Sequence, residues 1–220
     1  MEFVFHNPTR VFFGSGKIGV LGTELQKRGA KKVLLIAGGG SIRNNGVYDQ
    51  VVESLKEAGI NWIEAWGVQA NPTLEKVREI IALAHREQVD SVLAVGGGSV
   101  IDSGKAVAAG FYMEDIWKAV TDEERIKAAL PVYTVLTLSA TGSEMNSFAV
   151  ITNSETTHKA GLGSPLLYPV FTIIDPSVQA SLPFRQTVSG ALDATAHILE
   201  YYFTEENAIA TNAINTALLK

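Results

Sequence analysis

The chain has 220 residues, of which 46% are hydrophobic, a formal net charge of −5 and no cysteine. This length can bury a sizeable core, but an acidic balance without a basic run argues against nucleic acid as a partner. No apolar run reaches the ~18 residues of a membrane span, no signal-peptide pattern opens the chain, and the lack of cysteine fits a reducing compartment, so we expect a cytoplasmic globular protein.

Short apolar segments alternate with amphipathic segments as far as Asp175. The apolar segments predict strands at Phe3–Phe5, Arg10–Phe13, Lys32–Ala37, Trp62–Trp66, Val89–Val95, Pro131–Leu138, Phe148–Thr152, Lys159–Gly163 and Val170–Ile174. The amphipathic segments predict helices at Ile18–Arg28, Val47–Ala58, Val100–Gly110 and Glu123–Leu130, and one that has Asn71 as N-cap and Pro72 as first helical residue and ends near Arg86. This alternation indicates a Rossmann-like α/β fold with parallel pairing and ligands at the carboxyl ends of the strands.

The strand pattern stops at Asp175. A long apolar-periodic helix is predicted at Phe184–Phe203, and a second helix is predicted to start near Glu205. We therefore expect an α/β dinucleotide-binding domain over residues 1–182 and the first helices of an all-helical domain over residues 183–220. About forty residues are too few to bury a helical core by themselves.

Two predicted strands lead into the same turn sequence. The first turn is Gly38, Gly39, Gly40 and Ser41, and the second is Gly96, Gly97, Gly98 and Ser99. At a strand–glycine–helix junction, backbone N–H groups point outward, the helix dipole favours negative charge, and glycine lets a phosphate approach closely. Neither turn matches the Walker A or GxGxxG pattern, and a plain tight turn explains either one alone. Two such turns in one α/β unit predict a dinucleotide.

Polar side chains near these turns are candidates for contacts with a ligand. Asp102 and Lys105 lie one helical turn apart, and we predict that they are catalytic residues that contact cofactor or substrate, unless they only pair with each other. The hydroxyl-rich segment from Thr137 to Asn146 is suited to hold a cofactor phosphate or amide; an ordinary polar loop is the alternative. Lys159 is a candidate for a phosphate contact, although a lone lysine is more often solvated.

Asp193 and His197 are four residues apart on a predicted helix and therefore share one face. A carboxylate and an imidazole at this spacing can share a divalent metal. A structural Asp–His pair is the alternative, and it is the commoner arrangement where this spacing stands alone.

The first glycine turn also predicts a preference for NADP(H) over NAD(H). NAD-specific dehydrogenases usually place a carboxylate at the end of an early strand, where it binds the ribose 2′-hydroxyl. Here the strand that ends at Ala37 is followed by three glycines and Ser41. Nothing there repels a 2′-phosphate, and Ser41 and Arg43 are available to bind it. The alternative is a neutral loop that accepts either cofactor.

A series of segments in order resembles the iron-containing (group III) alcohol dehydrogenase family, most closely its butanol dehydrogenase and NADPH-dependent aldehyde reductase branch. They are FHNPTRVFFGSGKI, AGGGSIRNNGVYDQV, GVQANPT, AVGGGSVIDSGKAVAAG, TLSATGSEMN, IIDPSVQASLP and GALDATAHILEYYF. The resemblance implies a dehydroquinate synthase-like fold, in which an α/β dinucleotide domain precedes an all-helical domain and the active site lies between them. It also implies that this chain is the N-terminal part of such an enzyme.

The resemblance assigns a role to most of the candidate residues. It implies that the pyrophosphate is held by Gly97, Gly98 and Ser99, and that the cofactor beyond it is lined by Thr137, Ser139, Ala140, Thr141 and Asn146. Lys159 and the loop that ends at Leu182 complete the pocket. Asp193 and His197 match the first two of four metal ligands, and the two further histidine ligands of the family lie downstream of Lys220.

The implied activity is hydride transfer between NAD(P) and a primary alcohol or aldehyde. A divalent metal, Fe²⁺ or Zn²⁺, acts as Lewis acid on the substrate oxygen, and the full-length enzyme is expected to be a homodimer. One alternative is a nucleotide-binding module without catalysis. Another is a glycerol dehydrogenase-like or dehydroquinate synthase-like enzyme of the same fold.

Overall fold

The computed structural model describes residues 6–203 and 209–219. The chain divides into two compact units, Met1–Ala180 and Ser181–Lys220. The strand expected at Phe3–Phe5 and the helix start expected near Glu205 lie outside the described residues. Within the described ranges, no helix is both long enough and apolar enough to cross a membrane.

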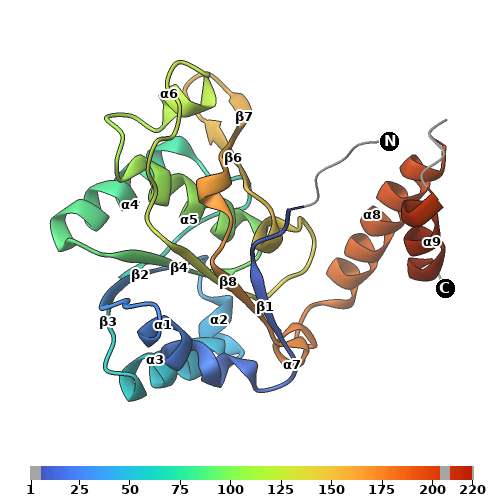
Figure 1. Cartoon of the computed structure of the whole chain (residues 1–220), viewed down its shortest axis with the longest axis horizontal. Coiled ribbons are helices and arrows are strands. Elements are labelled where there is room, and N and C mark those ends of the chain that lie inside the picture. The colour runs from blue at the N-terminus through green and yellow to red at the C-terminus, as the bar shows by residue number, and fades with distance from the viewer. Residues whose placement is uncertain (1–5, 204–208, 220) are drawn as a thin grey trace. The chain divides into compact units, whose positions relative to one another are not determined.

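A parallel six-stranded sheet forms the centre of the larger unit, with the strand order β1-β8-β5-β4-β2-β3 (Figure 1). The strands are β1 (Arg10–Phe13), β2 (Lys32–Ala37), β3 (Asn61–Ala65), β4 (Ser91–Gly96), β5 (Val132–Leu136) and β8 (Phe171–Ile174). Helices cover both faces of β2 and β4, so these strands are runs of apolar residues rather than alternating ones. The parallel sheet confirms the predicted α/β class.

Two layers of helices enclose the sheet (Figure 1). One face is covered by η1 (Lys17–Val20), α1 (Leu21–Gln26), α2 (Ser41–Asn44), α3 (Val47–Glu57) and α7 (Pro176–Gln179). The other face is covered by α4 (Leu74–Glu87), α5 (Gly98–Gly110) and α6 (Trp117–Val120). Alternate strand residues divide between the two cores, so that Val33 and Leu35 pack on the first layer while Leu34 and Ile36 pack on the second.

The path of the chain reverses between β2 and β4. From β2 the chain crosses through α3 on one face to β3, and it then returns through α4 on the other face to β4, on the opposite side of β2. In open α/β sheets, the crevice at such a reversal, outside the carboxyl ends of the strands, is where ligands bind. Both glycine turns leave their strands at this point.

A small antiparallel hairpin lies outside the main sheet. It pairs β6 (Phe148–Asn153) with β7 (His158–Gly163), whereas the sequence predicted parallel pairing. The four residues between the two strands are too few for a parallel crossover, which needs a dozen or more. The hairpin follows the short helix η2 (Ser143–Met145) and precedes η3 (Pro165–Leu167).

Three predicted helices differ from those in the structure. The helix expected at Ile18–Arg28 is divided into η1 and α1. The N-cap of α4 is Thr73, whose side chain accepts from Lys76 N (3.3 Å), because Asn71 adopts a left-handed conformation. No helix forms at Glu123–Leu130. The proline that follows Leu130 disfavours helical backbone there, and a single turn, α6, forms earlier in the chain.

The smaller unit consists of α8 (Phe184–Tyr202) and α9 (Ile209–Leu218) within its described residues. The Tyr202 hydroxyl donates to the Asn212 carbonyl oxygen (3.4 Å) and also meets the Thr216 hydroxyl, which joins the end of α8 to α9. A continuation into an all-helical domain stays a prediction.

Candidate functional site

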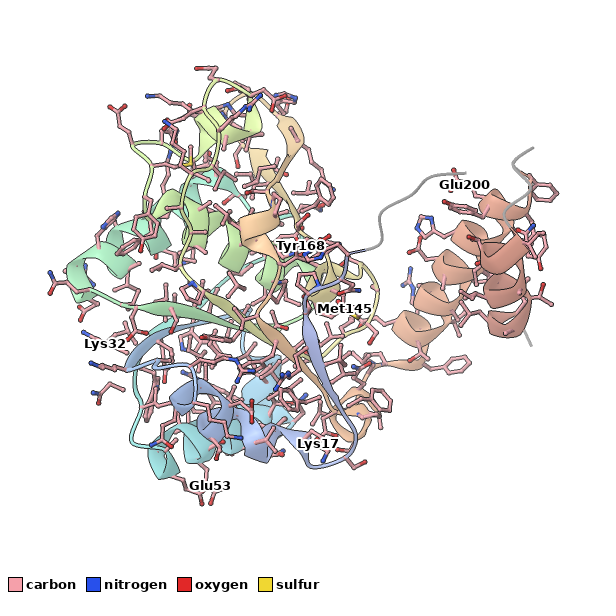
Figure 2. All side chains as sticks on the ribbon, in the orientation of Figure 1. Lys17, Lys32, Glu53, Met145, Tyr168 and Glu200 are labelled. Carbon is pink, nitrogen blue, oxygen red and sulfur yellow. The ribbon has the colours of Figure 1, made fainter. Side chains whose placement is uncertain are left out.

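The two glycine turns are neighbours at the carboxyl edge of the sheet. A Cβ atom added to Gly38 would lie 3.8 Å from Val100 Cγ2 at the start of α5. Figure 2 labels Lys32 at the amino end of β2 and Met145 at the end of η2, near the carboxyl ends of the strands, on opposite sides of the larger unit in this view. The loop rich in hydroxyl groups therefore lies on the same edge as the glycine turns.

The second turn begins a long helix without a side-chain cap. The N-cap residue of α5 is Gly97, whose carbonyl oxygen accepts from Val100 N (3.0 Å) and Ile101 N (3.2 Å). Since Gly97 has no side chain, the first N–H groups of α5 receive no side-chain acceptor from their own cap. The thirteen-residue helix aligns its peptide dipoles behind these N–H groups, which suits an anionic ligand.

Close packing of the loop around Thr141 on α5 explains why residue 98 is a glycine. A Cβ atom at this position would lie 2.3 Å from Thr141 Oγ1, so the glycine is needed for the loop around Thr141 to pack on α5. A bulky residue at Gly98 would therefore displace this loop, in addition to any effect on a phosphate at the turn.

The first turn has a different geometry. Around the position of a Cβ atom on Gly39 or Gly40 there is no protein atom within 4 Å, and Gly40 adopts a φ of +113°. The turn thus has free space beside its backbone. However, α2 has only four residues, so its dipole is small, and a phosphate here depends on backbone N–H groups and the Ser41 hydroxyl.

A cavity of about 270 Å³ opens beside the second turn. It brings together five residues that the sequence singled out: Ser99, Asp102, Thr141, Asn146 and Lys159. Three segments far apart in the chain supply them, namely α5, the loop before β6, and β7. This cavity extends from the start of α5, where an anion is favoured.

Asp102 is fixed on the wall of this cavity by two hydrogen bonds. Its Oδ1 accepts from the Ser143 hydroxyl (2.6 Å) and its Oδ2 accepts from Val150 N (3.0 Å). Burial raises the pKa of Asp102, although both hydrogen bonds favour the ionised form. The two hydrogen bonds therefore hold the Asp102 side chain in a fixed orientation on the cavity wall.

Lys105 does not reach the cavity, contrary to the expectation of a catalytic contact. Its side chain is completely buried, and its ammonium donates to Ser143 Oγ (3.0 Å) and to oxygens of Asn146 and Phe148. The alternative of a direct pair with Asp102 is not observed either, because the two side chains meet only through Ser143.

The sequence analysis missed Asn71 as a site residue. Asn71 lines the cavity, and its Oδ1 accepts from Lys159 Nζ (2.7 Å). The sequence suggested only a helix cap at this position. The position of Asn71 could have indicated a role in the site, because Asn71 follows β3 and so belongs to a loop at the carboxyl edge of the sheet. Ser143 and the stretch Phe148–Val150 also line the cavity, and only the fold of the hairpin brings them there.

The other loop residues are placed less directly. The Ser139 hydroxyl donates to Gln179 Oε1 (2.9 Å), which ties this loop to α7. Thr137 N donates to the Gly96 carbonyl oxygen (3.0 Å), so Thr137 lies beside the second turn. Ala140, the residue after Ser139, is exposed. A cofactor role for each of these residues stays a prediction.

Arg43 follows the first turn and is held in one orientation. Its guanidinium carbon lies 4.0 Å from the centre of the Trp66 ring, and Nη2 lies 3.6 Å from Glu64 Oε2. Glu64 also accepts from the Tyr48 hydroxyl (2.6 Å) and from Trp66 Nε1 (2.7 Å). Burial opposes ionisation of Glu64, but hydrogen bonds from aromatic side chains outweigh burial and lower its pKa. A phosphate at Ser41 would compete with Glu64 for Arg43.

The remaining predicted residues belong to the smaller unit. His197 Nε2 lies 3.7 Å from Asp193 Oδ2, and both side chains are more than half exposed. His197 Nδ1 also lies 3.7 Å from Glu200 Oε2. No group of three or more metal-ligating side chains is found in the described ranges. Leu182 precedes α8 in the same unit.

Comparisons with known proteins agree on one family. A family model described as iron-containing alcohol dehydrogenase matches residues 8–176. The NADH-dependent butanol dehydrogenase A of Clostridium acetobutylicum is 44% identical over 222 residues, covering 100% of this chain and 57% of that protein. The NADPH-dependent aldehyde reductase YqhD of Escherichia coli is 41% identical over 208 residues, covering 93% of this chain and 53% of that protein.

A solved structure gives the same result. The crystal structure of an NADH-dependent butanol dehydrogenase A from Thermotoga maritima matches with a TM-score of 0.94 at 56% identity, covering 97% of this chain and 54% of that one. The chain thus spans about half the length of the relatives it matches.

Proposed function

Because the chain belongs to the iron-containing alcohol dehydrogenase family, we propose that it forms the cofactor-binding part of an enzyme that interconverts primary alcohols and aldehydes with a nicotinamide cofactor. One observation carries the proposal most directly. Two glycine turns, the first with open space beside its backbone, lie at the reversal point of a parallel sheet, next to a cavity with a fixed carboxylate. The names of the relatives support the alcohol and aldehyde substrates.

The residues present fit a dinucleotide. The pyrophosphate is assigned to Gly97, Gly98 and Ser99 at the start of α5, and the adenosine end to the turn Gly38–Ser41. The nicotinamide half extends into the cavity, where Thr141, Asn146 and Lys159 hold it, together with Thr137, Ser139 and Ala140 as predicted from the sequence. When bound, the nicotinamide carries the hydride. The protein binds it, orients its ring and presents Asp102 at a fixed position.

The fit to a metal is incomplete in this chain. Asp193 and His197 are donors of the right kind for iron, but a catalytic site usually takes three protein ligands, and the described residues offer no third one. In the complete enzyme, we assign these two side chains as ligands of Fe²⁺.

For the cofactor, we propose NADP(H) in preference to NAD(H). The first turn carries no carboxylate, and Ser41 and the oriented Arg43 are placed after it. Relatives of both kinds exist, since the butanol dehydrogenases are named as NADH-dependent and the aldehyde reductase as NADPH-dependent. The dissociation constants of the two nucleotides decide the matter, and tighter binding of NAD(H) would show that the neutral turn does not select the 2′-phosphate.

A calorimetric titration of the purified chain with NADP⁺ tests the proposal. We expect one binding site per chain, with the circular dichroism spectrum of a folded α/β protein as the control. A folded chain that binds neither NADP⁺ nor NAD⁺ would overturn it. Alcohol-dependent reduction of NADP⁺ separates an active enzyme from the second candidate, a nucleotide-binding module without catalysis, which the incomplete metal site favours.

Location and assembly complete the proposal. A cytoplasmic enzyme is supported by the absence of cysteine from the sequence. A homodimer is proposed for the full-length enzyme, and light scattering of that protein tests it directly.

A further inference from the structure

The ammonium of Lys105 holds one short segment of the chain at four points. It donates to Ser143 Oγ (3.0 Å), to the Asn146 carbonyl oxygen (2.8 Å), to Asn146 Oδ1 (3.0 Å) and to the Phe148 carbonyl oxygen (2.8 Å). An ammonium has three hydrogens, so these acceptors use its whole capacity. All of them lie in the segment from η2 to the first residue of β6, which overlaps the end of the hydroxyl-rich stretch Thr137–Asn146.

This segment forms part of the cavity wall. Ser143 accepts from Lys105 and donates to Asp102, so one hydroxyl links the buried cation to the carboxylate at the cavity. Asn146 Oδ1 accepts from Phe148 N (2.9 Å) as well as from the ammonium. Asp102, Ser143 and Asn146 line the cavity, whereas Lys105 lies behind them and does not. The cation therefore supports the wall without touching its contents.

Burying an ammonium to support the cavity wall is energetically unfavourable by itself. Removing an ammonium from water costs several kcal/mol unless hydrogen bonds and opposite charges offset it. A methionine would fill the same space in α5 at no such cost, but it could not bind four oxygens of a segment with little regular structure. What a buried charge contributes in such a place is a single defined geometry.

We propose that Lys105 is a positioning residue, whose ammonium fixes the segment Ser143–Phe148, and through Ser143 the Asp102 carboxylate, in the shape that receives the nicotinamide half of the cofactor. This inference rests on the proposed function. It replaces the direct catalytic contact expected from the sequence. It also confines the effect of Lys105 to the cavity. The turn Gly38–Ser41 receives the adenosine end of the cofactor, and no contact between this turn and Lys105 is found among the described residues.

The titration of Lys105 supports this role. Burial lowers the pKa of Lys105 to about 8, although the charges of Asp102 and Glu144 oppose the shift. Lys159 is the other charged group that acts on Asp102 in this cluster. Above pH 8 a growing fraction of Lys105 is neutral and has two hydrogens to donate instead of three. The segment is then held less firmly, and binding at the cavity weakens.

Two probes and two variants test the proposal. NADP⁺ spans both turns and the cavity, whereas adenosine 2′,5′-bisphosphate covers only the adenosine end. In Lys105→Met we expect NADP⁺ to bind at least tenfold more weakly and the bisphosphate to stay within twofold of wild type. The control is Lys118→Met, which removes a surface lysine that pairs only with Glu114 in the described structure; it should change neither affinity.

The pH dependence gives an independent readout. For the wild-type chain, the ratio of the NADP⁺ affinity to the bisphosphate affinity should fall above pH 8, and in Lys105→Met this ratio should stay constant. A pH-independent ratio for wild type, or an equal loss of affinity for both probes in the variant, would refute a role confined to the cavity. If Lys105→Met does not fold, Ser143→Ala takes its place, with a smaller loss, about fivefold, for NADP⁺ alone.

Hydrogen exchange separates this inference from the proposed function. The amides of Phe148 and Val150 bond to Asn146 and Asp102, so they should exchange faster in Lys105→Met, or in Ser143→Ala, than in wild type. A wild-type chain that binds no nucleotide would defeat the proposed function, and the exchange rates would still decide whether Lys105 fixes the segment. Unchanged exchange at both amides would overturn the inference.

Discussion

Gly39→Ala is the sharpest test of the first glycine turn. A Cβ atom at this position would have no protein atom within 4 Å, and the φ of Gly39 lies outside the left-handed region. We therefore expect the free energy of unfolding to change by no more than about 0.5–1 kcal/mol. If a phosphate approaches the backbone here, the methyl group weakens at least one hydrogen bond to a charged group, which is worth about 1.5–3 kcal/mol. This corresponds to roughly tenfold to 150-fold weaker binding.

Titration calorimetry with NADP⁺ measures this effect, and urea denaturation measures the stability. Gly19→Ala is the matched control, because its Cβ also enters open space and Gly19, in η1, belongs to neither glycine turn. Gly98 is unsuitable for this purpose, since a Cβ there would lie 2.3 Å from Thr141 Oγ1 and a loss of binding would have two explanations. If Gly39→Ala binds NADP⁺ within twofold of wild type, the reasoning that places a phosphate beside this turn is refuted.

Three further outcomes follow from the structure. In Gly22→Ala the new Cβ would lie 2.0 Å from the Ser54 carbonyl oxygen and push α1 from α3; we expect a loss of about 1–3 kcal/mol, and an unchanged urea midpoint would contradict it. Folding lowers the pKa of Lys105 from 10.5 to about 8, so the unfolded chain binds more protons between these values. The free energy of unfolding should then rise with pH over this window, by at most about 3 kcal/mol, and the rise should vanish in Lys105→Met; a flat wild-type profile argues against it. Because Asp193 and His197 supply only two donors, gel filtration should leave less than one Fe²⁺ per chain, and stoichiometric retention would show that other ligands complete the site.

The sequence was sufficient for the elements with a strong apolar pattern. The apolar runs of β2 and β4 are buried from both sides, and both glycine turns directly follow them, so the carboxyl edge of the sheet was predictable. The weakly periodic stretch around Leu130 was not. There, the following proline and packing on α5, where Leu130 N donates to the Ala108 carbonyl oxygen (3.0 Å), outweigh local helix propensity.

Side-chain roles were harder to predict than the position of the site. Spacing along α5 placed Asp102 and Lys105 one turn apart, and it could not tell that one faces the cavity while the other points beneath the hairpin. That difference depends on where Ser143 and Phe148 return to the helix. Such long-range contacts are not encoded in any local pattern.

The pairing of β1 with β8 bears on how the chain folds during synthesis. Arg10 lies opposite Phe171, so β1 meets its neighbour in the described sheet about 160 residues later. At ~5–20 residues per second on the ribosome, roughly 8–30 seconds pass before β8 is available. During that time β2, β3 and β4 can already pair, while the backbone N–H and C=O groups of Arg10–Phe13 have no strand to pair with. A contact so distant in sequence slows folding, and the unpaired segment is the part of the nascent chain that chaperones would be expected to bind.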